Sequence, residues 1–213
     1  MKWLGRLFAG RRDDHTLAAD LREALAHWSA LPPADTGRTH LETRYVVLNT
    51  RASGMSADHD ALQSVAAIAV EGGRIEPMHS FHALLDDTVE EQLTALVSFV
   101  GAGPVVVFNA ELNRALIEKA LRQHLGISPE WLWLDLYWLL PGLFGEVHAK
   151  PVRLAQWMDS LELGTFQRFH ALGDAWVLAR LLLALQSRAL AEGRRSPHAL
   201  ADLEASLRAV AGR

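Results

Sequence analysis

Apolar residues in the first half of the chain fall into runs with the spacing of strands. Residues 45–48 are four β-forming apolar residues in succession, which is typical of a central strand covered on both faces. Residues 61–70 and 74–85 are two more β-rich runs, and the glycines at 72 and 73 between them suit a tight hairpin. The pattern therefore predicts a meander of three strands.

The second half alternates helical spacing with short apolar runs. Apolar residues recur every three or four positions over 88–100 and 111–125, which predicts two helices. Short apolar runs predict strands over 104–108 and 131–136. Further helices are expected at 152–161, 170–186 and 197–210. An alternation of this kind indicates an α/β fold.

Two tryptophans lie on one face of the predicted strand at 131–136. Trp131 and Trp133 are separated by one residue, so their side chains project to the same side of an extended strand. We interpret them as packing residues of the core rather than as a platform for stacked bases.

The N-terminal part is expected to be an appendage. A helical pattern starts at Asp14 and stops at Pro32 and Pro33, and the small and polar residues 34–37 that follow are typical of a linker. We therefore divide the chain into residues 1–38, which hold an arm, a helix and a linker, and a main domain of residues 39–213. With 213 residues, half of them hydrophobic, the chain can bury one sizeable core.

Residues 1–12 form a short basic arm with an amphipathic pattern. The apolar residues that would share one helical face are Trp3, Leu4, Leu7 and Phe8. The arm lacks the long apolar centre and the cleavage site of a signal peptide, so we expect it to stay on the protein. It could make weak contact with a membrane surface or dock on a partner. We favour the alternative that its apolar residues pack on the domain.

Composition sets limits on the partners. The net charge of −4 and the isoelectric point near 6.2 lack the positive balance of avid nucleic-acid binders. No cysteine is present, which suits a reducing compartment, so a cytoplasmic location is expected. No apolar run is long enough to span a bilayer.

Candidate functional residues follow the first strand. α/β sheets carry their chemistry at the carboxyl ends of strands, which directs attention to Asn49 and Arg51. Because one residue separates them, their side chains project to the same face of an extended strand.

This stretch resembles the first motif of the DEDDh family of 3′-5′ exonucleases, the group of the DNA polymerase III proofreading subunit and ribonuclease T. Residues 45–55 match the pattern V-V-x-D-x-E-T-T-G, except that Asn49 and Arg51 stand where the family has its aspartate and glutamate. Residues 106–113 resemble the second motif, V-x-H-N-A-x-F-D, with Asn113 at the place of its aspartate.

The third motif of the family is better preserved in this sequence. Residues 170–175 resemble H-x-A-L-x-D-A, so His170 matches the general-base histidine and Asp174 the last metal-binding carboxylate. The segment Leu134-Asp135-Leu136 also resembles an I-D-T segment of the family, and the resemblance covers residues 44–187. Between Leu85 and Thr88 the chain nearly lacks a longer family segment that frames the substrate's terminal nucleotide.

The resemblance implies a ribonuclease H-like fold, in which helices flank a mixed five-stranded sheet of order 3-2-1-4-5. The helical appendage precedes it in the chain. The resemblance also implies chemistry with Mg²⁺ or Mn²⁺ held by four carboxylates. Only Asp174 remains of the four, because Asn49 and Asn113 are neutral and Arg51 is positively charged. We therefore expect no metal and no other cofactor, and an ion pair between Arg51 and Asp174 in the metal's place.

Three functions stay open. The first is an inactive exonuclease-like domain that acts through protein contacts, and the second is a module that binds a nucleotide or single-stranded nucleic acid. The third is an active 3′-5′ exonuclease on single-stranded DNA or RNA ends with an altered metal site. The acidic balance and the shortened segment before Thr88 favour the first over the second. The lost carboxylates argue against the third, since His170 lacks a metal-bound water to deprotonate.

Overall fold

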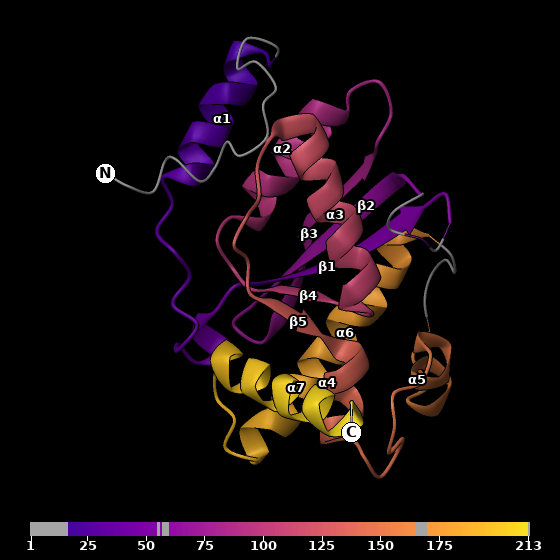
Figure 1. Cartoon of the computed structure of the whole chain (residues 1–213). Helices are drawn as coiled ribbons and strands as arrows, with labels where there is room; N and C mark the ends of the chain where they lie inside the picture. The colour runs from indigo at the N-terminus through magenta and orange to yellow at the C-terminus, as the bar shows by residue number, and fades with distance from the viewer. Residues whose placement is uncertain (1–16, 55, 57–59, 165–169, 213) are drawn as a thin grey trace.

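A five-stranded mixed sheet forms the centre of the computed structural model, which describes residues 17–54, 56, 60–164 and 170–212. The sheet order is β3-β2-β1-β4-β5, as the family resemblance implies (Figure 1). β1 pairs antiparallel with β2, as β2 does with β3, whereas β4 runs parallel to both β1 and β5. The strands are β1 (Tyr45–Ala52), β2 (Leu62–Glu71), β3 (Arg74–Leu84), β4 (Val105–Val107) and β5 (Trp133–Asp135).

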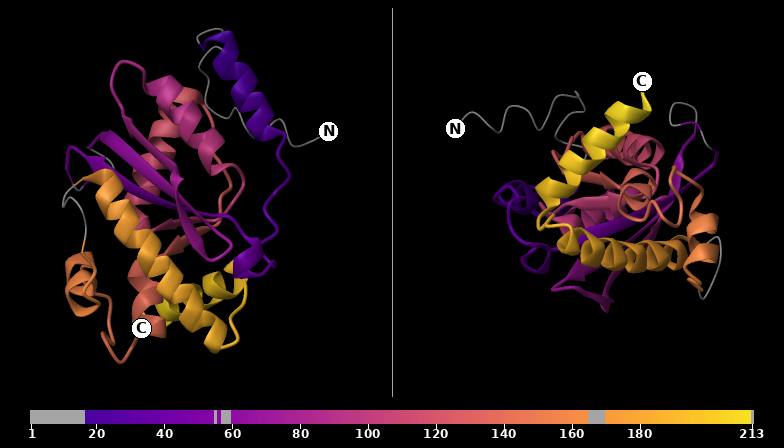
Figure 2. Two further views of the ribbon diagram at one scale, coloured as in Figure 1. Left: turned by 180° about the vertical axis from the view of Figure 1, so that it is seen from behind. Right: turned by 90° about the horizontal axis from the view of Figure 1, so that it is seen from below.

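Helices cover both faces of this sheet (Figures 1 and 2). The face of Tyr45 and Val47 packs against α4 (Leu136–Leu143) and α6 (Ala171–Ala191). The opposite face, with Val46 and Leu48, packs against α2 (Val89–Val100) and α3 (Ala110–Leu125). All four of these β1 side chains are fully buried, which is why this strand lacks a polar alternation. The remaining helices are α1 (Ala19–Ser29), α5 (Leu154–Ser160), α7 (Pro197–Ala211) and the 3-10 turn η2 (His40–Glu42).

The N-terminal helix and the segment after it are attached to the main domain. α1 packs on α2, buries Leu25 and donates a hydrogen bond from Trp28 Nε1 to the Gly101 carbonyl oxygen at 3.0 Å. In the following segment, the buried His40 ring bonds to the Tyr45 hydroxyl at 2.6 Å and to the Arg194 carbonyl oxygen at 3.0 Å. The division at residue 38 stays a prediction, and the basic arm of residues 1–12 lies outside the described residues.

One edge of the sheet, strand β3, is interrupted. The pairing steps from Ile68 opposite Ser80 to Val70 opposite Ile75, so that Ala69 alone faces residues 76–79. The interruption contains Pro77, which has no amide hydrogen to donate. The edge strand is therefore regular only on either side of this bulge.

The structure differs from the predicted elements around residue 135. β5 has three residues instead of six, and an unpredicted helix, α4, follows it directly. α4 is largely enclosed between α6 and α7, so apolar residues occupy all of its faces. The run 136–140 is therefore apolar throughout and lacks the periodicity that would predict a helix. Trp131 is buried in the core, as predicted. In the part of the chain that the structure describes, no helix is both long and apolar enough to cross a membrane.

Candidate functional site at the carboxyl end of β1

Asn49 lies beside the first turn of α6. It pairs with Ala66 of β2, which in turn pairs with His82 of β3, so these three side chains share one face of the sheet. The Asn49 Nδ2 group donates a hydrogen bond to the Ala171 carbonyl oxygen at 3.3 Å. The register and this bond together place the start of α6 over the end of β1.

His170 is the N-cap residue of α6, and its ring lies close to the ring of a second histidine, His82. Its ring centroid lies 5.2 Å from that of His82, with the planes tilted by 37°. Its Nδ1 atom is buried and has no hydrogen-bond partner within the part of the chain that the structure describes. The pKa of His82 is lowered, mainly by desolvation of its ring and secondarily by His170. Sequence reasoning missed His82 as a site residue, although the hairpin register that aligns it with Asn49 is the signal that identifies it.

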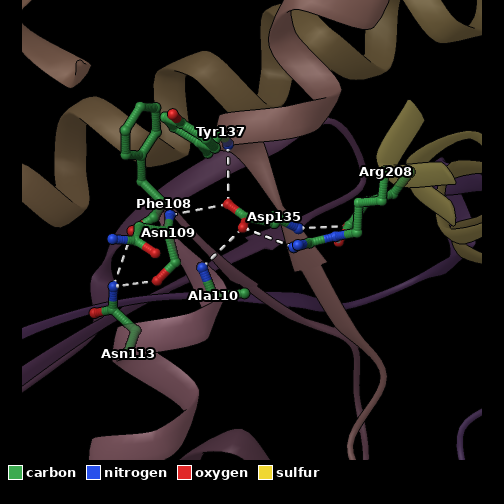
Figure 3. A network of polar contacts seen from close by, with 8 residues as sticks. Phe108, Asn109, Ala110, Asn113, Asp135, Tyr137 and Arg208 are labelled. Carbon is green, nitrogen blue, oxygen red and sulfur yellow. Dashed lines mark hydrogen bonds and ion pairs between the residues drawn. The ribbon is translucent and has the colours of Figure 1, made fainter. Parts of the chain in front are cut away.

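Asn113 is buried and its amide is used by the protein itself. The Nδ2 group donates to the carbonyl oxygens of Phe108 at 2.8 Å and Asn109 at 2.9 Å (Figure 3). Its Oδ1 atom accepts a hydrogen bond from the Thr50 hydroxyl at 2.7 Å. Since Thr50 lies between Asn49 and Arg51, Asn113 is brought to the same end of β1 as the other two substituted positions.

Arg51 does not form the predicted ion pair. Its side chain is exposed, and none of the ion pairs among the described residues joins it to Asp174. The pairing register of β1 shifts between Arg51 and Ala52, the last two residues of the strand, although Ala52 still pairs with Leu62 of β2. In water an arginine gains little from a fixed partner, because solvation and side-chain entropy oppose the Coulomb attraction. Asp174 is partly exposed in the first turn of α6, where its amide donates to the His170 carbonyl oxygen at 3.0 Å.

A buried carboxylate, Asp135, organises the turn before α3, the helix that carries Asn113. It accepts hydrogen bonds from the amides of Asn109 at 2.9 Å and Ala110 at 2.8 Å, which open α3, and from that of Tyr137 at 3.0 Å in α4 (Figure 3). Asn109 has a left-handed backbone with φ of 67°, which costs free energy that the two bonds to Asp135 and the adjacent turn offset. Asp135 therefore fixes the start of α3, whose first turn carries Asn113.

Side chains of the C-terminal helix α7 complete the hydrogen-bond network around Asp135. Arg208 donates to Asp135 Oδ2 at 3.0 Å and to Glu204 Oε1 at 2.8 Å, and Glu204 Oε2 accepts the Asp135 amide at 2.8 Å. Burial raises the pKa of Glu204, against the opposing effect of these hydrogen bonds. The guanidinium also lies 5.3 Å from the centre of the Trp138 ring. Sequence reasoning missed Arg208 and Glu204, which lie about 70 residues from Asp135 along the chain, so no local pattern joins them.

The side chains at this end of β1 do not fit a magnesium or manganese site. Such ions are held by several anionic oxygens, whereas Asn49 and Asn113 are neutral and Arg51 is cationic. Among the described residues, no group of three or more histidine, cysteine, aspartate or glutamate side chains could hold a metal ion. We therefore assign no step to a metal.

The sheet order and the helices on both faces are those of the ribonuclease H-like exonuclease fold. Solved structures with this fold include the zinc-bound form of E. coli exonuclease I with single-stranded DNA, which is 10% identical with a TM-score of 0.56. That match covers 68% of this chain and 41% of exonuclease I, so the chain spans less than half of that protein.

Exonuclease X shows the same fold at nearly its full length. Its complex with 5′-overhanging duplex DNA is 14% identical to this chain with a TM-score of 0.55, and the match covers 75% of this chain and 99% of exonuclease X. Exonuclease I from Methylocaldum szegediense is 12% identical with a TM-score of 0.56, over 68% of this chain and 41% of its own. No protein-family model and no curated protein matches the chain. At these identities the similarity establishes the fold.

Proposed function

We propose that this chain is an exonuclease-like domain without metal-dependent nuclease activity, and that it acts by binding. Its partner is a protein, or a nucleotide or single-stranded nucleic acid that binds at the carboxyl end of β1. The observation that carries the proposal is the environment of Asn113. Its Nδ2 group faces two carbonyl oxygens at 2.8 and 2.9 Å, so the surroundings require a donor at this position.

An aspartate at position 113 would meet those two carbonyl oxygens with an acceptor. Both oxygens would lose the side-chain donor, although the Asn109 oxygen keeps the main-chain amide of Asn113 at 3.2 Å. Both would also repel the carboxylate, at a cost of about 1–3 kcal/mol in a buried setting. The Asn113 amide is therefore a required part of the local structure and not merely a neutral replacement for a carboxylate. Arg51 adds a positive charge near the same strand end, which disfavours a cation further.

Nuclease assays test the loss of activity. The full-length chain, mixed with 3′-end-labelled single-stranded DNA or RNA and millimolar Mg²⁺ or Mn²⁺, is expected to degrade no more substrate than its Asp174→Ala variant. Hydrolysis by the parent that Asp174→Ala abolishes would contradict the proposal and favour an active exonuclease with an altered site.

Binding assays in EDTA distinguish the two kinds of partner. Solved relatives of the fold are complexes with single-stranded or duplex DNA, which supports testing a labelled oligonucleotide by fluorescence anisotropy. Binding that weakens at least fivefold in Arg51→Ala, and is unchanged in the exposed Arg153→Ala, would assign the carboxyl end of β1 to nucleic acid. No binding by the parent would leave the protein partner as the supported function.

Reversion of the three substituted positions provides a complementary test. The triple variant Asn49→Asp, Arg51→Glu, Asn113→Asp is expected to be less stable by about 1–3 kcal/mol, the cost of a carboxylate at position 113 without a metal. It is expected to bind Mg²⁺ by calorimetry before it shows turnover, because the segment before Thr88 stays short. The matched control replaces the same three residues with alanine and is expected to bind none. Full nuclease activity in the triple variant would show that the short segment is no obstacle.

A further inference from the structure

A small, mainly apolar cavity lies between the end of α1 and the loop before β5. The side chains that shape it are those of Trp28, Leu31 and Pro33, from α1 and the segment after it, and of Pro129 and Trp131, from the loop. Its volume is about 140 Å³. An apolar cavity of about 150 Å³ takes up a benzene ring, so the space fits a compact group of that size.

The two tryptophans are held in place by one carbonyl group. The Nε1 groups of Trp28 and Trp131 both donate to the Gly101 carbonyl oxygen, at 3.0 and 2.9 Å. Two hydrogen bonds use both lone pairs of that oxygen. The indoles therefore present carbon surface to the cavity, and a ligand can form a hydrogen bond with neither their N–H groups nor this carbonyl.

The charge at the cavity is negative. Among the described residues that line it, Glu130 alone is charged, and its side chain is exposed. None of the ion pairs within the described part of the chain involves Glu130. The faces of indole rings also carry negative potential and attract cations. Both features favour a positively charged occupant.

A quaternary ammonium group meets these requirements better than other cations. A primary ammonium carries three N–H donors, and they would lose water without gaining acceptors from the indoles or the Gly101 carbonyl. A trimethylammonium group has about the bulk of a benzene ring and no N–H group. Its methyl groups carry the positive charge on an apolar surface, which is what tryptophan rings bind.

We infer that the cavity between Trp28 and Trp131 binds the trimethylammonium group of a small quaternary ammonium compound, and that the Glu130 carboxylate attracts its charge. The cavity lies at the amino ends of β4 and β5, which run parallel to β1. It is therefore at the opposite end of the sheet from the carboxyl end of β1. The inference is independent of the proposed function and goes beyond it.

A titration followed by NMR tests this site in the full-length, ¹⁵N-labelled protein, with choline as the probe. The indole N–H signals of Trp28 and Trp131 are expected to shift and to saturate at millimolar choline. The signal of Trp157, which is buried on the other face of the sheet, is the internal control and should stay in place. Ethanolamine, and the neutral analogue in which carbon replaces the choline nitrogen, should bind at least fivefold more weakly.

Two variants separate the contributions of charge and ring. Glu130→Gln, at an exposed position that leaves the fold intact, should weaken choline binding at least fivefold. Glu91→Gln, an exposed residue of α2 away from the cavity, is the matched control and should change it less than twofold. Trp28→Leu should weaken it at least fivefold while the carboxylate stays.

Three results would overturn the inference. The first is the absence of a saturable shift at Trp28 and Trp131. The second is equal binding of choline and its neutral analogue, which would make the cavity a site for uncharged apolar groups. The third is choline binding that Glu130→Gln leaves unchanged.

Discussion

Asn113 and Arg51 lie at the same end of β1 but in opposite environments. Asn113 is buried and uses its amide nitrogen and oxygen in hydrogen bonds, while Arg51 is exposed. The motif positions of both residues could be found in the sequence. The hydrogen-bond partners of Asn113 and the exposure of Arg51 could not be predicted, because they depend on the turn before α3 and on the register shift at the end of β1.

Removal of the Arg51 side chain is expected to leave stability almost unchanged. Because the side chain is exposed and lacks an ion pair among the described residues, Arg51→Ala should change the free energy of unfolding by less than about 0.5 kcal/mol. Urea denaturation at neutral pH measures the difference. A loss of about 2 kcal/mol or more, the scale of a broken buried pair, would revive the ion pair with Asp174 that the sequence suggested.

His40 is expected to make stability depend on pH. Burial lowers its pKa below the usual value of 6.5, against a smaller opposing effect of the Arg194 carbonyl. The unfolded chain therefore takes up a proton first, and stability is full above about pH 6.5 and falls as the pH drops, by at most about 1.4 kcal/mol per unit for one proton.

Thermal unfolding of the parent and of His40→Asn between about pH 7.5 and 5.5, a window that spans the ordinary histidine pKa, checks this. The variant should be less stable at the upper end but lose less on acidification, because position 40 no longer titrates. The exposed His198→Asn variant is the control and should follow the parent. Parallel curves for His40→Asn and the parent would show that His40 does not cause the dependence.

At the scale of elements, the local patterns predicted the three long strands and most helices, because one buried face gives a regular spacing. They failed at Asp135. There β5 gives way to α4 inside a continuous apolar run, and the residue that caps α4 also binds the start of α3. Its other partners, Glu204 and Arg208, come from α7. Only the folded chain brings these elements together.

Asp135 and Arg208, which form an ion pair, should differ in how much each contributes to the free energy of unfolding. Asp135 is 2% exposed and receives four hydrogen bonds, so Asp135→Asn loses the charge and part of the acceptor capacity, at a cost of about 3 kcal/mol. The Arg208 side chain is 40% exposed, and water can replace part of its contact, so Arg208→Gln should cost about 1 kcal/mol.

Urea midpoints measure both changes, with Arg188→Gln as the control. Arg188 pairs with Glu146 and Glu192 at the surface, and its loss should cost less than about 0.5 kcal/mol. Equal costs for Asp135→Asn and Arg208→Gln would mean that the guanidinium, and not the helix starts, accounts for the role of Asp135.

For the whole molecule, the sheet order could be predicted because a three-strand meander followed by two helix-connected strands leaves few arrangements, and resemblance to a known family selected one. The relation of α1 to the rest could not. The prolines after it indicated a linker, yet Leu25 and Trp28 attach the helix to the core that contains α2.

Leu25 provides a test of whether α1 unfolds with the domain. If the two unfold together, Leu25→Ala should lower the free energy of global unfolding by about 2–3 kcal/mol, as for other buried leucines. Leu41→Ala, at a side chain that is 59% exposed, is the control and should cost less than about 0.5 kcal/mol. A midpoint unchanged by Leu25→Ala would identify residues 1–38 as a separable appendage.

The interruption of β3 also bears on how the protein behaves at high concentration. An unpaired outer strand is a template on which strands of other molecules can add, and this is a common start of aggregation. Here residues 76–79 break the row of amides and carbonyls, and Pro77 removes one donor from it. The interruption therefore makes this edge of the sheet a poor template for fibre growth, even though the Met78 side chain within it is 86% exposed.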